Sequence, residues 1–548
     1  MPVTPSSSSL PRRLACAALA AALSLGAPAV HAQDAAAPRL PALGDAGTED
    51  LSIGDERRLG EQIMREARRD PALLDDAVLL AYVQSLWQPL VQAARARGDI
   101  DANLERQFPW EIFLVRDRSV NAFALPGGYV GVHLGLVAIT SNRDQLASVL
   151  AHELTHVTQR HIARSIGNAR STSLVGIAAL LIGILAASRS NNVDVANAAI
   201  MGGQGAALQG QLNFSREMER EADRIGFAVL SGAGFATGGM AQMFERLQGN
   251  TAVADSGAFP YLRTHPLTVE RISEARSRML LAGAEAAPRP TLQHALMQAR
   301  ARVLMDPSTQ TMQRLAGGAT SSPHATDRIA ALYGGAMARM RLGDGAAAEE
   351  MAAQALRQAQ ALPARDAEAE RVLALLPAEA RLAMGDGAGA WRALEAVAAA
   401  PATAARNDRS VLTLRAQAAL KWHERDARAA ADAVRASTEA LQTWLSEHTR
   451  DAPAWQLLAG TADALGQKLR SMRASAEAQA ALGDLNGAID RLRAAQAAAR
   501  GTGAPGGAAA GGGPSEFIDA SIIDTRLRQL LEERRQLAIE ARQRGEGR

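Results

Sequence analysis

The stretch that most constrains this chain is the segment from Val149 to His161, which reads VLAHELTHVTQRH. Within it, His152, Glu153 and His156 form an H-E-x-x-H pattern. At about 100° per helical residue, the two histidines lie about 40° apart, one turn above the other. Two neutral imidazoles in this relation can bind one Zn²⁺, and the glutamate beside the first can act as a general base. The pattern predicts a zinc site on a helix.

The residues around the motif favour a buried helix. Ser141 and Asp144 have the spacing of a capping box at its start. Apolar residues then recur at helical intervals, at Leu146, Val149, Leu150, Leu154 and Val157. Unpaired histidines on a buried helix would be costly. A metal site therefore explains them better than an exposed helix with two surface histidines does.

A second predicted helix, from Phe214 to Gly226, offers a third metal ligand. It places Glu219 and Asp223 four residues apart on one face. A carboxylate completes a His₂Glu site and leaves a fourth position open for water, and Asp223 can accept the remaining N–H of a ligand histidine. We therefore expect one Zn²⁺ per chain.

Four motifs occur in order between residues 121 and 271. They are Asn121-Ala-Phe-Ala-Leu-Pro-Gly-Gly-Tyr-Val130, the H-E-x-x-H helix, Glu219-x-Glu-Ala-Asp223 and Thr264-His-Pro-x-x-x-x-Arg271. Together they resemble the HtpX and CaaX-prenyl-endopeptidase family of gluzincin metallopeptidases. The resemblance implies a zinc endopeptidase with Glu153 as catalytic base. It also implies that Glu219, not Glu221, is the ligand, and Glu221 lies about 200° round the helix from Glu219.

The same resemblance implies roles for two further parts of the chain. His265 and Arg271 resemble a pair that faces the oxyanion. Because Pro266 disfavours a helix, we expect His265 on a loop, where it either donates to the oxyanion or occupies the fourth zinc position close to the metal. A strand beside the metal is expected to pair by its edge with an extended substrate. Its candidate residues are Gly128, Tyr129, Val130 and Gly131.

Two other histidines are expected to be structural. His161 follows His156 by five residues, about 140° round a continuous helix, so it would not share the metal-binding face. His133 ends a predicted strand and belongs to no motif.

Composition indicates a mainly α protein. Of 548 residues, 47% are hydrophobic and 3% aromatic. The 59 basic and 57 acidic residues give a net charge of +2, which does not favour nucleic acid as a partner. We expect a gluzincin-type peptidase domain at residues 51–285. It would contain a small β-hairpin or sheet made by Trp110–Val115 and Tyr129–His133, and an all-α domain would follow.

Residues 291–500 are predicted to form tetratricopeptide-like helical repeats. The turns Leu342-Gly-Asp344, Met384-Gly-Asp386 and Leu482-Gly-Asp484 are each followed, four residues after the aspartate, by Ala348, Ala390 and Ala488. Arg425-Asp426 with Ala430 is a weaker copy. The uneven spacing leaves an irregular helical domain as the alternative. A Gly/Ala linker at 501–514 and an amphipathic helix within 515–548 follow, and the leucines of that helix can dock on the protein.

The first residues predict export. Residues 1–32 read as a cleaved secretory signal, with Arg12 and Arg13 before an apolar run, and residues 33–50 as a flexible leader. We therefore expect a periplasmic protein. The apolar stretch 174–187 is too short to span a bilayer, so we expect a buried or interfacial hairpin there, and peripheral membrane contact stays open. Residues 191–211 are either a lid or a plain connector.

The sequence thus predicts a periplasmic zinc metalloendopeptidase that acts on unfolded or misassembled proteins. The resemblance implies turnover of outer-membrane β-barrel proteins, with the repeats docking substrate or the β-barrel assembly machinery. One alternative is a periplasmic chaperone or adaptor with a vestigial metal site, and the intact Glu153 argues against it. Another is a membrane-embedded prenyl-protein peptidase, and the lack of several long apolar runs argues against that.

Overall fold

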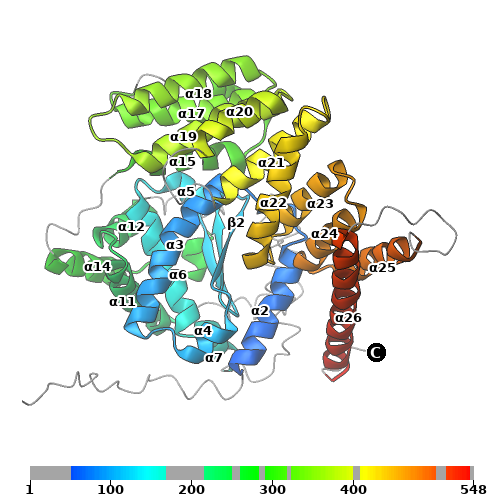
Figure 1. Cartoon of the computed structure of the whole chain (residues 1–548). Coiled ribbons are helices and arrows are strands. Elements are labelled where there is room, and N and C mark those ends of the chain that lie inside the picture. Colours follow the sequence, from blue (N-terminus) through cyan, green and yellow to red (C-terminus); the bar gives the residue numbers. More distant parts are fainter. Residues whose placement is uncertain are drawn as a thin grey trace, which may run out of the picture. The chain divides into compact units, whose positions relative to one another are not determined.

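The computed structural model of the chain describes residues 51–167, 215–249, 260–282, 290–317, 322–398, 408–501 and 514–543. The predicted signal and leader, the apolar stretch 174–187, the predicted lid and residues 502–513 of the predicted linker lie outside these residues. The described part is mainly α-helical with one small sheet, as the sequence predicts (Figure 1). None of the helices in this part combines the length and apolar character needed to cross a membrane.

The first third of the chain contains a four-stranded sheet. Its strands are β1 (Leu73–Leu74), β2 (Glu111–Val115), β3 (Ala122–Leu125) and β4 (Tyr129–His133), in the order β1-β2-β4-β3. β2 and β4 are parallel, and the other two pairs are antiparallel. The two strands predicted from the sequence are both present.

The prediction of an edge strand at Gly128, Tyr129, Val130 and Gly131 is wrong. These residues lie in or next to β4, which is an interior strand. Val130 is opposite Ile112 of β2 on one side and opposite Ala124 of β3 on the other. Backbone hydrogen bonds therefore occupy both sides of β4. Among the described residues, the edge strand at this end of the sheet is β3.

Helices cover both faces of the sheet. Successive residues of a strand point to opposite faces. Ile112 and Leu114 of β2 therefore join the main core, with α3 (Ala77–Arg97) and α6 (Arg143–Thr158). Phe113 of the same strand packs on the other face with α2 (Ile53–Ala67). The sheet is thus held between α2 and the pair α3 and α6 (Figure 1).

The motif helix α6 begins one residue later than the predicted capping box requires. Asn142 is its N-cap and accepts a hydrogen bond from the backbone N–H of Gln145, at 2.9 Å. The side-chain oxygen of Gln145 accepts in return from the backbone N–H of Ser141, at 2.8 Å. Asp144 accepts instead from the N–H of Ala236, at 3.0 Å, which ties α6 to the loop after α11.

Three more helices complete the surroundings of α6. They are α11 (Arg216–Gly232), α12 (Gly238–Gly249) and α14 (Val269–Ala282), while α4 (Ala102–Gln107), α5 (Leu134–Ile139), α7 (His161–Gly167) and α13 (Tyr261–Thr264) are short. The close packing of α11 on α6 favours a glycine. A Cβ on Gly226 would lie 3.2 Å from the backbone of Ala151 and 3.3 Å from Cα of His152. Gly226 thus brings α11 close to the motif.

The remainder of the described chain consists of helices that pack on their neighbours in sequence. They are α15 (Leu292–Met305), α16 (Thr309–Ala316), α17 (Ala325–Arg341), α18 (Gly345–Gln360), α19 (Ala367–Ala383), α20 (Gly387–Ala398), α21 (Arg409–His423), α22 (Ala431–Glu447), α23 (Ala452–Ala464), α24 (Lys468–Ala481), α25 (Leu485–Gly501) and α26 (Pro514–Gln543). This is the all-α region that the sequence predicts.

The predicted Gly-Asp turns connect successive helices. Gly343, Gly385 and Gly483 have φ of 82°, 73° and 80°, a left-handed conformation that glycine adopts readily. The aspartate after each glycine accepts from a backbone N–H of the next helix. The alanines four residues further on are fully buried. A further turn of this kind, at Gly466 with φ 71°, joins α23 to α24 and was missed because Gln467 replaces the aspartate.

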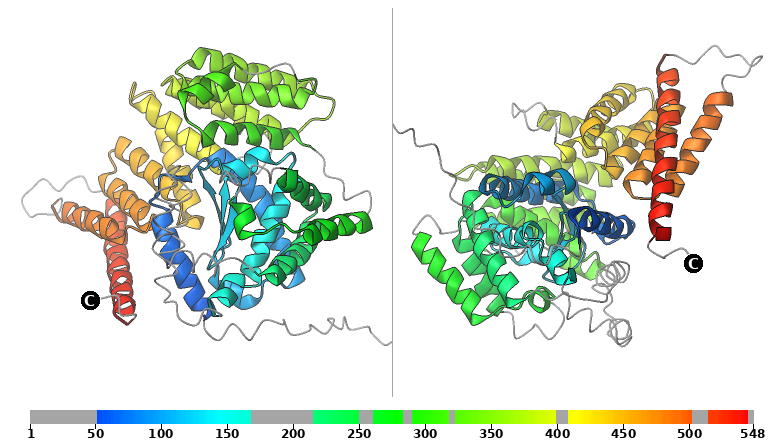
Figure 2. Two further views of the ribbon diagram at one scale, coloured as in Figure 1. Left: turned by 180° about the vertical axis from the view of Figure 1, so that it is seen from behind. Right: turned by 90° about the horizontal axis from the view of Figure 1, so that it is seen from below.

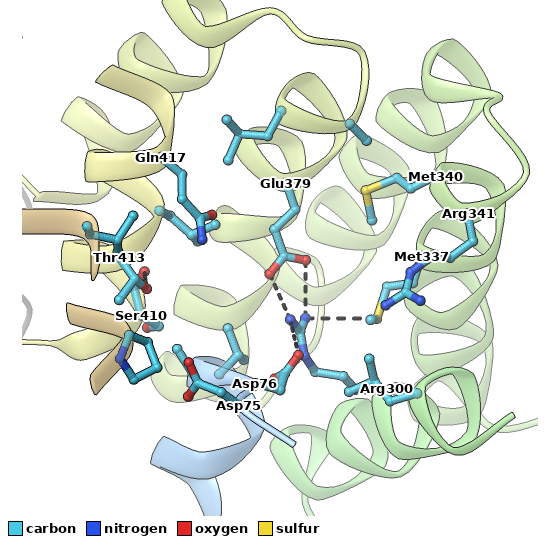
Figure 3. Close-up of a pocket in the computed structure, with 18 of the residues that line it drawn as sticks. Asp75, Asp76, Arg300, Met337, Met340, Arg341, Glu379, Ser410, Thr413 and Gln417 are labelled. Atoms are coloured by element: carbon cyan, nitrogen blue, oxygen red, sulfur yellow. Dashed lines mark hydrogen bonds and ion pairs between the residues drawn. The ribbon is translucent and has the colours of Figure 1, made fainter. Parts of the chain in front are cut away.

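The hydrophobic core continues past the predicted boundary at residues 285–291. One cluster of buried side chains extends from α3 and α6 through α15 to α22. At this junction Arg300 of α15 pairs with Asp76 at 2.7 Å and with Glu379 of α19 at 2.9 Å. Figure 3 shows Arg300 between the two carboxylates, at the wall of a cavity of about 530 Å³.

The C-terminal helix docks on the protein, as its leucine pattern predicts. Ile523, Leu527 and Leu530 of α26 are buried against α24 and α25. Arg526 of α26 pairs with Glu477 of α24 at 2.9 Å. Figure 2 shows α26 alongside these helices.

Candidate metal centre

Four buried side chains bring metal-binding atoms together. His152 and His156 come from α6, Glu219 from the first turns of α11, and His265 from the residue after α13. Their ligand atoms all lie within 4.8 Å of one another. The Nε2 atoms of His152 and His156 are 3.0 Å apart, and Oε1 of Glu219 is 3.4 Å from Nε2 of His156. None of the four residues is more than 2% exposed.

The charge states of Glu219 and His156 suit a cation. Burial raises the pKa of the Glu219 carboxyl, but the charges on His265 and His152 outweigh it and hold this pKa far below its usual value. Burial holds the pKa of His156 well below 6.5, so its ring is neutral and has a lone pair to offer. Two imidazoles and a carboxylate are the donors of a catalytic zinc site. The residues present therefore fit zinc.

Glu153 lies beside this cluster, fully buried. Among the described residues, neither of its carboxylate oxygens accepts a hydrogen bond of good geometry. The nearest basic atom is Nε2 of His265, 3.5 Å from Oε1. Burial raises the pKa of the Glu153 carboxyl, which His265 and His152 only partly oppose. A buried carboxylate that accepts no hydrogen bond of good geometry is costly, so this group has a use other than stabilising the fold.

His152 is oriented by Asp223, as expected for one ligand histidine. Its Nδ1 lies 2.9 Å from Oδ1 of Asp223. Burial lowers the pKa of His152, but Glu219 and Asp223 raise it more, to about 9 in the metal-free protein. Its Nδ1–H therefore donates to a carboxylate, an arrangement common around zinc.

The guanidinium of Arg271 is held by carboxylates of α11 and by the loop before α14. Its Nε and Nη2 donate to the two oxygens of Asp223, at 2.6 and 2.8 Å. Its Nη1 donates to the carbonyl of Pro266 and lies 2.7 Å from Oε2 of Glu219. These contacts engage the guanidinium, and the expected oxyanion role stays a prediction. Arg271 thereby orients Glu219 and Asp223 of α11.

Residues 81–279 match Peptidase family M48. This part of the chain, here termed the M48 domain, is similar to the peptidase domain of that family. The chain is 36% identical over 262 residues to the beta-barrel assembly-enhancing protease of Escherichia coli (strain K12), which covers 48% of this chain and 51% of that protein. It is 32% identical over 197 residues to the mitochondrial metalloendopeptidase OMA1 of Saccharomyces cerevisiae, which covers 35% of this chain and 53% of that protein. The chain thus spans about half the length of the curated relatives it matches.

In the M48 domain, His265 lies among the metal ligands. Its Nδ1 is 3.0 Å from Oε1 of Glu219 and 3.3 Å from Nε2 of His152. The ring of Tyr261 stacks on it, with centroids 4.6 Å apart. Tyr261 was not foreseen, because a single tyrosine before a loop carries no sequence signal. The position of His265 suits a fourth ligand, and that role stays a prediction.

His161 lies closer to the M48 metal centre than a continuous helix allows. α6 ends at Thr158, and Arg160 has a φ of 51° before α7 begins at His161. The chain therefore turns, and Nδ1 of His161 lies 2.8 Å from Nδ1 of His156. Nε2 of His161 is 3.1 Å from Oε2 of Glu221, the glutamate set aside as a ligand.

His133 of the M48 domain lies apart from this cluster. Its Nδ1 is 2.9 Å from the hydroxyl of Ser119, and burial lowers its pKa to about 4. These contacts suit the expected structural role.

Proposed function

We propose that the M48 domain of this chain is a zinc-dependent endopeptidase. The observation that carries the proposal is the buried donor set of His152, His156 and Glu219, with the buried carboxylate of Glu153 beside it. Bound zinc supplies a Lewis acid that polarises the scissile carbonyl and makes water a stronger acid. A purely structural zinc site has no need of such a carboxylate.

Glu153 performs the proton transfers. Its raised pKa makes the carboxylate a better proton acceptor than an exposed glutamate. It takes a proton from the attacking water and later passes it to the leaving amine. Asp223 and Arg271 keep His152 and Glu219 oriented. Reacting groups that are held in place need less reorganisation during the reaction.

β3 is the strand on which we expect the substrate to pair. It is one of the two edge strands of the described sheet, it packs against α6, and the backbone of Ala124 is close enough to Glu153 to lower the pKa of that carboxyl. A peptide added to this edge would pass the base in an extended conformation. Backbone pairing of this kind accepts varied side chains, which suits a protease for unfolded chains.

Cleavage of unfolded protein tests the proposal. Glu153→Gln keeps the size of the side chain but removes its basicity, so the variant should lose at least roughly 100-fold in rate on casein. Zinc content should stay at one per chain in the variant. Equal cleavage by parent and variant would reject the peptidase and leave the chaperone or adaptor as the better reading.

The physiological role we propose is periplasmic removal of misassembled outer-membrane β-barrel proteins. The names of the relatives that act in β-barrel assembly and the signal-like residues 1–32 support it. The helices from α15 to α25 would dock the substrate or the β-barrel assembly machinery. Crosslinking in cells with Glu153→Gln should retain β-barrel precursors. Recovery of only soluble proteins would contradict this role without affecting the peptidase.

A further inference from the structure

We propose that His161 and Glu221 are positioning residues for the metal ligand His156. The inference rests on the zinc site of the proposed function and extends it. A histidine and a carboxylate would together hold one ligand ring in the tautomer and orientation that zinc requires.

The roles of the ring nitrogens follow from which atom of His156 faces the cluster. Its Nε2 lies 3.0 Å from Nε2 of His152 and 3.4 Å from Oε1 of Glu219, so Nε2 offers the lone pair to the metal. A neutral imidazole has one hydrogen, which must then be on Nδ1. The only orientation that satisfies the 2.8 Å contact has His156 Nδ1 donating to His161 Nδ1.

The same reasoning fixes His161. Because its Nδ1 accepts, its hydrogen is on Nε2, which donates to Oε2 of Glu221 at 3.1 Å. Arg164 holds that carboxylate in place from the same helix as His161, with Nη1 2.9 Å from Oε2. His161 has no exposed surface, so water does not compete for either nitrogen. The result is a chain of hydrogen bonds from His156 through His161 to Glu221.

The backbone is built to deliver His161 to this position. A continuous helix would turn His161 about 140° away from His156. The left-handed conformation of Arg160 breaks the helix, and non-glycine residues adopt it at a cost in energy. The side chain of Arg160 is held by buried Glu56, at 2.8 Å, and by the carbonyl of Leu51, at 2.7 Å. A strained residue with such support fits a site where geometry matters.

Both histidines of the motif are thus oriented by carboxylates of one helix. α11 provides Glu219 as a ligand, Asp223 for His152 directly, and Glu221 for His156 through His161. Groups that orient metal ligands typically change metal affinity by roughly 10–100-fold when they are removed. Asp223 contacts His152 directly, whereas Glu221 reaches His156 only through His161. The effect of removing Glu221 should therefore depend on an intact His161.

Zinc affinity of the full chain, measured by competition with a chelator, tests the inference. His161→Phe keeps a planar ring but neither accepts nor donates, and it should weaken zinc binding roughly 10–100-fold. His161→Gln can accept with Oε1 and donate with Nε2, so it should bind zinc within about threefold of the parent. Thermal unfolding of the metal-free proteins shows whether each variant folds. If both variants lose affinity equally, or both keep it, the hydrogen-bond role is rejected.

Glu221 provides a second, independent test. Its side chain is only half-buried, so we expect its substitution to leave the fold intact. Glu221→Ala should weaken zinc binding, whereas Glu217→Ala, at an exposed position on the same helix, should not. In the double variant with His161→Phe, loss of Glu221 should add little, since Glu221 acts through His161. Fully additive losses would overturn the proposal.

Cobalt-substituted parent and His161→Phe should also differ in their visible absorption. A parent that binds no zinc would instead reject the proposed function itself.

Discussion

At the scale of single residues, the site depends on which carboxylate of α11 faces which histidine. Glu219, Glu221 and Asp223 alternate along one helix, yet only Glu219 lies among the ligand atoms. The family pattern and the helical angle both select Glu219. Neither of them shows that Glu221 contacts His161, because that contact depends on the conformation of Arg160.

The two glutamates should therefore differ in zinc stoichiometry. Glu219→Ala removes a ligand, and we expect it to bind well below one zinc per chain after dialysis. Glu221→Ala should still reach one per chain at saturating zinc, although with weaker affinity. Metal analysis of the purified variants measures this. Full zinc in both variants would show that Glu219 is not a ligand.

His265 provides a second prediction at this scale. Because its ring lies among the ligand atoms, it can occupy the position that substrate or water needs. His265→Ala should therefore cleave unfolded casein faster than the parent, on the order of several-fold. A rate loss on every substrate would indicate an oxyanion donor instead. Parent-like cleavage by the variant would contradict both roles.

At the scale of secondary-structure elements, the sequence predicts which elements exist better than how they pair. α6, β2 and β4 fall where the sequence pattern places them, because apolar spacing and capping residues act locally. The order of the strands depends on contacts between distant segments, so nothing within Tyr129–His133 indicates that β4 is interior. The sequence also does not predict the helix break after Thr158, since Arg160 is not a residue that typically ends a helix.

The contact of α15 with α3 and α5 should depend on pH. His294 of α15 is fully buried, with Nε2 2.8 Å from the carbonyl of Thr140 and Nδ1 2.6 Å from the hydroxyl of Tyr82. Burial lowers its pKa to about 4. The unfolded chain, with a histidine pKa near 6.5, therefore binds the proton first as pH falls. Stability should be lost progressively between about pH 6.5 and pH 4, by up to about 3 kcal/mol.

Denaturant unfolding of the parent and of His294→Gln measures this effect. Other buried groups, His133 among them, contribute equally to both proteins, so the difference between them isolates His294. From pH 7.5 to pH 4.5 the parent should lose more stability than the variant. Identical pH dependence would show that His294 is not the group responsible.

At the scale of the whole molecule, the peptidase part and the following helices share one core. Composition and the Ala-Pro-Arg-Pro segment suggest a boundary near residue 285, but buried side chains pack continuously across it. A change in composition indicates which secondary structure a segment prefers locally, whereas the extent of a hydrophobic core is set by packing between distant segments. The domain limits therefore stay a prediction, and the helical repeats are visible chiefly through their Gly-Asp turns.

Arg300 should be essential to this shared core. Arg300→Met leaves Asp76 and Glu379 without their cationic partner, and these carboxylates are only 10% and 14% exposed. The substitution should lower the free energy of unfolding by about 3–5 kcal/mol. The control Arg276→Met breaks a half-exposed ion pair with Glu245. It should lower the free energy of unfolding by less than about 1 kcal/mol. Chemical denaturation of both variants makes the comparison. Equal losses of stability in the two variants would contradict the role of Arg300 in the shared core.

The approach of α11 to α6 at Gly226 restricts how this site can vary. A Cβ there would press on the backbone beside His152, so the helix that carries Glu219 and the one that carries the histidines would have to move apart by a few tenths of an ångström. The distance between ligands from two helices is thus set by a residue that offers no atom to the metal. In a library of random variants, this position would tolerate fewer substitutions than many residues closer to the reacting atoms.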